Sequence, residues 1–209
     1  MKTRSYNIET RRKQQAVLKE SIVAATAELH AAKGVIATSY PDIAKRAGVT
    51  LPTVHSHFPT QHELLEGCTS HIIAKAPVLP VEKIMASSDL PAAAKLLVAA
   101  MEQQHLHFEP WLVWREDRLI PFLAELAVAV RKSHASLVAK LLAQHLGPGE
   151  RREMVAGWET ILSFDFWHRL VRGHKLSRHA ARRVLIQYLL AAVGPTLASP
   201  PIQVPRRKP

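Results

Sequence analysis

The segment over residues 38–65 limits most strongly what this chain can fold into, because it combines three helix starts with one tight glycine turn. At the first start, Ser39 and Asp42 have the S-x-x-D spacing of a capping box, in which each side chain accepts a hydrogen bond from the other residue's backbone N–H. Gly48 follows within ten residues and suits the left-handed position that ends a helix and turns the chain. The spacing predicts a short helix between them.

Two further helix starts follow the glycine. Thr50 can cap a helix that has Pro52 in its first turn, where a missing N–H costs nothing. Thr60 and Glu63 repeat the capping-box spacing and open a third helix. These signals predict a short helix over 51–57 between two others, which is the arrangement of a helix-turn-helix. This motif presents one short helix to the DNA major groove.

The run I-A-x-x-A-G-V-T-x-P-T-V-x-x-H-F-x-x-x-x-E-L-L, preceded by SIVAATAELHAAKG, resembles the DNA-binding domain of the TetR family of bacterial transcriptional regulators. The match extends from about Ser21 to about Leu65. The resemblance implies an all-α homodimer with an N-terminal DNA-reading domain and a larger C-terminal domain that pairs the subunits and holds a small effector. In the mechanism that it implies, the effector shifts the helix over 61–75 like a pendulum, and a repressor leaves its operator.

The resemblance assigns the DNA contacts to the second helix of the motif and to the helix starts around it. Threonine and serine hydroxyls can bond to base edges or phosphates, and apolar groups can meet a thymine methyl. The start of the third helix offers backbone N–H groups to a phosphate. The expected DNA-binding residues are Ser39, Tyr40, Thr50, Leu51, Pro52, Thr53, His55, Ser56, His57, Thr60 and Gln61.

Three positions depart from the family's pattern. His55 stands where the family most often has tyrosine, Gln61 replaces a phosphate-contacting lysine, and Pro41 replaces a base-reading side chain of some members. The loss of one phosphate contact lowers the salt dependence of binding by about one unit, so DNA binding should survive. If His55, His57 and His62 titrate near neutrality, DNA affinity rises as pH falls; neutral histidines that only donate hydrogen bonds give no such response.

Composition agrees with a helical chain. Hydrophobic residues make up 47% of the 209 residues, with much alanine and leucine, which favour helices. No apolar stretch is long enough to span a bilayer, and the polar N-terminus does not resemble a secretory signal. A single cysteine, Cys68, excludes a disulfide framework. We therefore expect a cytoplasmic protein that associates with the nucleoid when it is bound to DNA.

The net charge of +11 is not concentrated in the helix-turn-helix. Through Glu66 the chain has nine Lys and Arg against six Asp and Glu, and the remaining residues have nineteen against eleven. Arg4, Arg11, Arg12 and Lys13 form a basic arm ahead of the first predicted helix. This arm could lie along phosphates or enter the minor groove, or it could be a solvated, disordered terminus.

Proline positions and helical periodicity divide the chain, with Pro77 and Pro80 at the expected hinge. The expected limits are a DNA-binding domain over 1–76, with a first helix over about 12–32, a helix-turn-helix over 39–57 and a connecting helix over 61–75, then an effector-binding and dimerisation domain over 77–197, and a disordered basic tail over 198–209.

Two helices near the C-terminus, over about 149–171 and 177–193, are the expected dimerisation elements. Each has large apolar side chains along its length, and two such helices from each subunit can form a four-helix interface. The same side chains can also belong to the intrachain core. A two-fold dimer places two recognition helices one turn of DNA, or a multiple of it, apart, so we expect a palindromic operator.

Large side chains in the central part of the chain are candidates for an effector pocket, because such pockets are mostly apolar and aromatic with a few polar groups. The alternative is that they are ordinary core. The charged run around Glu116 is instead expected to be solvated. The candidate ligand-binding residues are Met101, His105, Phe108, Trp111, Trp114, Phe122 and Trp167.

The sequence contains no nucleophile elbow, phosphate-binding glycine loop or recognisable pair of catalytic carboxylates, so we expect no enzyme. Its twelve histidines lack ligand spacing with a supporting carboxylate or cysteine, so neither a metal nor a cofactor is expected. One other class of function remains open. The missing lysine at Gln61 and the modest charge of the N-terminal domain fit a helical adaptor that has lost sequence-specific DNA binding.

Overall fold

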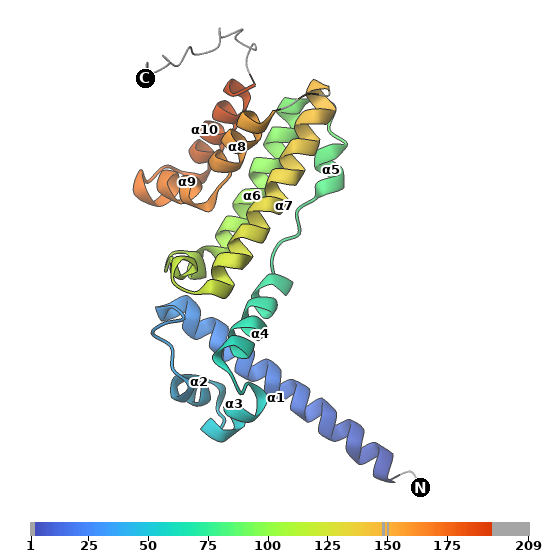
Figure 1. Ribbon diagram of the computed structural model, residues 1–209, viewed down its shortest axis with the longest axis vertical. Coiled ribbons are helices and arrows are strands. Elements are labelled where there is room, and N and C mark those ends of the chain that lie inside the picture. Colours follow the sequence, from blue (N-terminus) through green and yellow to red (C-terminus); the bar gives the residue numbers. More distant parts are fainter. Residues whose placement is uncertain (1–2, 148, 150, 194–209) are drawn as a thin grey trace, which may run out of the picture. The chain divides into compact units, whose positions relative to one another are not determined.

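The computed structural model describes residues 3–147, 149 and 151–193, and its regular elements there are all helical (Figure 1). The all-α prediction is confirmed. The elements are α1 (Thr3–Lys33), α2 (Tyr40–Ala47), α3 (Leu51–His57), α4 (Gln61–Ala74), α5 (Val81–Met85), α6 (Leu90–Leu112), the 3-10 turn η1 (Glu116–Arg118), α7 (Pro121–Leu146), α8 (Arg152–Ile161), α9 (Phe164–His168), the π-helical turn η2 (Arg169–Gly173) and α10 (Arg178–Ala191).

The chain forms two compact units, and neither is continuous in sequence. Among the described residues, the first contains those from Thr3 through Pro77 together with Leu106–Ala129, and the second contains Val78–His105 and those from Val130 to Val193. The division therefore falls inside α6 and inside α7. The first unit includes the expected domain over 1–76 and adds a segment from the expected effector domain, because side chains of that segment bond to α1 and α4. The expected disordered tail over 198–209 lies outside the described residues.

Helix α1 begins much earlier than expected, at Thr3 rather than near residue 12. No glycine or proline lies between Thr3 and Gly34, so nothing in the sequence interrupts the helix. The basic residues Arg11, Arg12 and Lys13 consequently occupy exposed turns of a helix and not an extended arm.

The predicted helix signals of the first unit are present as expected. Ser39 Oγ accepts a hydrogen bond from Asp42 N at 3.3 Å, and the Asp42 carboxylate accepts one from Ser39 N at 3.2 Å, which completes the capping box of α2. Gly48 ends α2 with a φ of +68°. This left-handed conformation favours glycine. Thr50 Oγ1 caps α3 by accepting from Thr53 N at 3.3 Å.

A small hydrophobic core holds α2, α3 and the start of α4 on α1, and Figure 1 shows these helices gathered beside it. Val54 is fully buried and Phe58 is 2% exposed, so one face of α3 and its C-cap point inward. Burial of side chains of this size contributes about 1.5–3 kcal/mol each. The core consists of Ile22, Val23, Ile43, Ala44, Val54, Phe58 and Leu64.

The second unit packs α6, α7, α8 and α10 through buried apolar side chains, including Leu97 of α6, Leu141 of α7, Trp158 of α8 and Leu185 of α10. The expected single helix over 149–171 is wrong. It is divided into α8, α9 and η2, because Ser163 Oγ accepts from Phe166 N at 3.3 Å and begins a new helix. No helix in the described part of the chain is long and apolar enough to cross a membrane.

Candidate nucleic-acid interface and ligand-binding region

Helix α3 presents an exposed face opposite its buried one. Val54 anchors the helix, whereas Leu51, Pro52, His55 and Ser56 are exposed. Thus four of the residues expected to contact DNA lie on the surface of the short helix. Since Thr50 caps the start of the helix and Phe58 packs at its end, both ends of this surface are held in place.

The hydroxyl groups of α3 already have partners within the helix. Ser56 Oγ donates to the Thr53 carbonyl at 2.9 Å, so its remaining capacity is as an acceptor. Thr50 Oγ1 and Thr53 Oγ1 share a hydrogen bond at 2.8 Å. The amino groups of adenine and cytosine are the major-groove donors that an acceptor such as Ser56 Oγ can meet.

Tyr40 supports the recognition helix from α2. Its hydroxyl donates to the Phe58 carbonyl at 3.1 Å, and its ring stacks on the His55 imidazole with centroids 4.5 Å apart and planes 16° from parallel. Burial, and to a lesser extent Glu63, raises the pKa of Tyr40. The hydroxyl is thus directed at the protein backbone, and the ring orients His55.

Ser39 is similarly occupied in holding the start of α2. Besides its capping bond, its hydroxyl donates to Asp42 Oδ2 at 2.7 Å, and Lys33 Nζ donates to the same oxygen at 2.7 Å. The hydrogen bond from Lys33, followed by those from Ser39, lowers the pKa of Asp42 to about 2. This ionised carboxylate ties the end of α1 to the start of α2.

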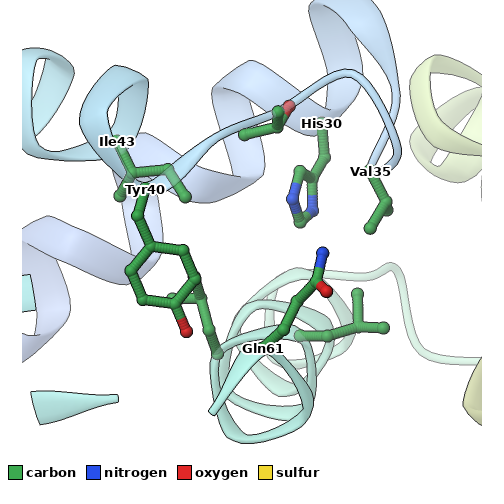
Figure 2. Close-up of a pocket in the computed structure, with 8 residues that line it drawn as sticks. His30, Val35, Tyr40, Ile43 and Gln61 are labelled. Carbon is green, nitrogen blue, oxygen red and sulfur yellow. The ribbon is translucent and has the colours of Figure 1, made fainter. Parts of the chain in front are cut away.

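Gln61 lies beside a small hollow of the first unit, shown in Figure 2. In Figure 2 its side chain extends from α4 toward His30 and Val35. The hollow has room for about one water molecule. The start of α4, capped by Thr60 and Glu63, nevertheless offers backbone N–H groups to a phosphate. The hollow is lined by His30, Val35, Thr38, Tyr40, Ile43, Gln61, Leu64 and Leu65.

Beside this hollow, two buried groups are held in their neutral forms. His30 Nδ1 lies 3.6 Å from Cys68 Sγ. Burial lowers the pKa of His30 to about 4, against an opposing effect of Glu116, and burial raises the pKa of Cys68 to about 12. At neutral pH the pair therefore packs as a neutral imidazole and a neutral thiol, and the thiol is a poor nucleophile.

The seven expected ligand-binding residues are divided between the two units. Phe108, Trp111, Trp114 and Phe122 lie in the first unit. The Trp111 and Trp114 indoles donate to carbonyls of α1, Phe108 packs on a small core cluster around Cys68, and Phe122 meets the His62 ring edge-on at 5.3 Å. Met101, His105 and Trp167 are buried in the second unit.

Around His105 the second unit contains buried polar groups that sequence reasoning missed. His105 Nε2 donates to the Leu162 carbonyl at 2.9 Å, and its ring lies 5.4 Å from that of Trp167. Burial lowers the pKa of His105 to about 4. One turn earlier on α6, Glu102 is 1% exposed. The sequence did contain a signal of this buried polar site, namely a charged residue next to Met101 on an otherwise apolar helix face.

Two arginines of α10 neutralise Glu102 through the same oxygen. Arg182 Nε donates to Glu102 Oε2 at 2.6 Å and Arg178 Nη2 at 3.3 Å. Within the described residues, Glu102 Oε1 and the indole nitrogens of Trp158 and Trp167 are buried without a hydrogen-bond partner. Buried polar atoms without a partner are candidates for contact with a polar ligand. Among the same residues, no group of three or more His, Cys, Asp or Glu side chains could hold a metal ion.

Comparisons with known proteins agree with this geometry. Residues 22–68 match the family model of bacterial regulatory proteins, tetR family. A TetR-like transcriptional regulator from Rhodococcus sp. RHA1 has a similar structure, with a TM-score of 0.64 and 17% identity over 85% of this chain and 96% of that one. The TetR-family regulator PfmR from Thermus thermophilus has a TM-score of 0.55 and 24% identity over 82% and 96%.

A third similar structure is the multidrug binding protein EbrR complexed with imidazole, with a TM-score of 0.55 and 16% identity over 85% of this chain and 89% of that one. At these identities the structural likeness concerns the fold. No curated protein matches the chain by sequence.

Proposed function

We propose that this protein is a homodimeric transcriptional regulator that binds a palindromic operator. The proposal starts from the match of residues 22–68 to the TetR family of bacterial regulatory proteins. The observation that supports this proposal most directly is the exposed face of α3, which is capped by Thr50 and anchored by Val54 and Phe58. A short helix that is held in place and has an exposed face is what reading of the major groove requires.

The proposed DNA contacts fall into two groups. Residues of α3 read base edges, and residues around the starts and ends of α3 and α4 bind phosphates and fix the register. Ser39 and Tyr40 act mainly by holding α2 and His55, given their internal hydrogen bonds. The base-reading group is Thr50, Leu51, Pro52, Thr53 and Ser56, and the phosphate-binding group is His55, His57, Thr60 and Gln61.

The second unit is the proposed site of dimerisation and of effector binding. Tyr188 of α10 is 53% exposed and meets the Phe166 ring edge-on at 6.2 Å, so α9 and α10 offer aromatic surface to a second copy. The buried groups Glu102, His105, Trp158 and Trp167 are the proposed effector contacts. A similar structure that binds imidazole supports a small-molecule effector. Release of DNA on effector binding would make the protein a repressor.

The test is a selection of duplexes by the wild-type protein from a random-sequence pool, followed by affinity measurements on the selected DNA. We expect a palindromic consensus and binding that weakens steeply with salt. Ser56→Ala should lower the affinity and relax specificity at one position of each half-site, by about 1–3 kcal/mol. Ser70→Ala, an exposed serine on α4, is the matched control and should bind as the wild type does.

A helical adaptor without sequence-specific DNA binding is the second candidate function. The direction of the Gln61 side chain, toward His30 and not away from the first unit, favours it because the expected phosphate contact is then weaker. In that case the selection yields no consensus, and any retardation of DNA at low salt is the same for wild type and Ser56→Ala.

A further inference from the structure

The segment Leu106–Ala129 lies far from the helix-turn-helix in sequence, yet it belongs to the same compact unit. Its polar side chains donate hydrogen bonds to backbone carbonyls near the C-terminal ends of α1 and α4. Three such contacts are present: from Trp111 Nε1 to the Ala27 oxygen at 2.9 Å, from Trp114 Nε1 to the Ala31 oxygen at 3.1 Å, and from His107 Nε2 to the Ile72 oxygen at 2.9 Å.

Glu116, at the start of η1, makes the most specific contact of this segment. Its Oε2 accepts the Val35 N–H at 2.6 Å, and its Oε1 accepts the Ile36 N–H at 2.9 Å. Hydrogen bonds to an ionised acceptor are about twice as strong as neutral ones. The expectation of a solvated charge run is therefore wrong for Glu116, because both of its carboxylate oxygens are bonded to the loop that joins α1 to α2.

Gly34 provides the space for this carboxylate. Its φ is +81°, and a Cβ added to it would lie 2.6 Å from Glu116 Oε1. A larger residue at this position would therefore be strained by its backbone conformation and would also collide with the carboxylate. Two independent features, the paired N–H donors and the missing side chain, fit the same bound position of Glu116.

The loop that Glu116 holds leads directly into the recognition elements. Thr38 Oγ1 donates to the Gly34 carbonyl at 2.7 Å, which closes the loop just before the cap of α2. Val35 and Thr38 line the hollow of Figure 2 together with Tyr40, whose ring carries the stacked His55. A change in this loop therefore moves the start of α2 and, through Tyr40, the exposed face of α3.

We propose that Glu116 is a positioning residue for DNA recognition, which fixes the loop over 34–38 and thereby the angle at which α2 and α3 meet DNA. This inference rests on the proposed DNA-binding function. If Glu116 has this role, the segment Leu106–Ala129 contributes to DNA recognition, although the match to the family model ends at residue 68.

The experiment compares Glu116→Ala and Glu116→Gln with the wild type on a duplex that the wild type has selected. Circular dichroism fixes a temperature at which every variant is folded. We expect Glu116→Ala to lower the affinity by on the order of tenfold, because two N–H groups lose their acceptor. The affinity of Glu116→Gln should lie between those of the wild type and Glu116→Ala, since its amide has one acceptor oxygen. Glu125→Ala, an exposed carboxylate on α7 of the same unit, should match the wild type.

Hydrogen exchange at the Val35 and Ile36 amides gives a readout that does not need DNA. Both amides should exchange faster in Glu116→Ala than in Glu125→Ala, and an unchanged rate overturns the contact itself. Equal affinity of wild type and Glu116→Ala for the selected duplex overturns the positioning role alone. If the wild type selects no duplex, the proposed function fails and the positioning role fails with it. If Glu116→Ala does not fold, the same measurements on Glu116→Gln and the wild type test the positioning role.

Discussion

Some residues of the first unit hold α3 in place, and others lie on its surface and are proposed to contact DNA. Val54 and Phe58 are buried, whereas Leu51, at the start of the same short helix, is 38% exposed. Stability and DNA affinity should therefore respond to different substitutions. This separation is testable because both kinds of residue lie close together in the chain.

Phe58→Ala should lower the free energy of unfolding by about 3–5 kcal/mol, since it leaves a cavity between α1 and α3. Leu51→Ala should change it by less than about 0.5 kcal/mol, because the side chain is at the surface, while it weakens binding to the selected duplex. Urea denaturation and fluorescence anisotropy measure the two effects. Equal loss of stability in both variants would contradict the assignment of the buried and exposed faces.

His30 should make stability depend on pH. Its pKa falls from 6.5 to about 4 on folding because of burial, so above pH 6.5 it is neutral in both states. Between about pH 6.5 and 4 the unfolded chain binds a proton that the folded chain does not, and stability falls as pH falls. The full effect is on the order of 3 kcal/mol. In His30→Leu the unfolding free energy should decline less steeply over this range; an unchanged slope would refute the assignment.

At the scale of elements, caps and turns decide where each helix begins and ends. The capping boxes of α2 and α4 and the glycine that ends α2 could be predicted from residue spacing alone, because these interactions join residues close together in the chain. The break between α8 and α9 was missed. A single serine, Ser163, gives a weak signal inside a long apolar stretch, and the helix-forming residues around it predict continuity.

The two left-handed glycines at the ends of α1 and α2 should differ in their tolerance of substitution. Gly48→Ala meets open space and should cost about 1–2 kcal/mol, the strain of a left-handed L-residue. Gly34→Ala adds a collision with the Glu116 carboxylate to similar strain, so it should be the more destabilising change. Thermal unfolding of both variants measures the difference. Equal melting temperatures would argue against a tightly fitted carboxylate at Gly34.

At the scale of the whole molecule, the proposed dimer predicts a particle of twice the 23.3 kDa protomer mass. Tyr188→Glu should shift this mass toward the monomer, because it puts a charge on the exposed aromatic surface of α10. Val78→Glu is the control, since Val78 is 90% exposed and lies outside the proposed interface. Light scattering coupled to size exclusion gives the masses, and an intact dimer in Tyr188→Glu would place the interface elsewhere.

The sequence by itself determined the helix-turn-helix, since its caps and its glycine turn depend on residues only a few places apart in the chain. It also determined the all-helical class. Only the tertiary structure decided the roles of Glu116, Trp111 and Trp114, which bond to backbone atoms about eighty positions earlier in the chain. Every residue except proline has the same backbone N–H and C=O groups, so no sequence pattern marks the partner. Only the folded structure shows which backbone group each of these side chains contacts.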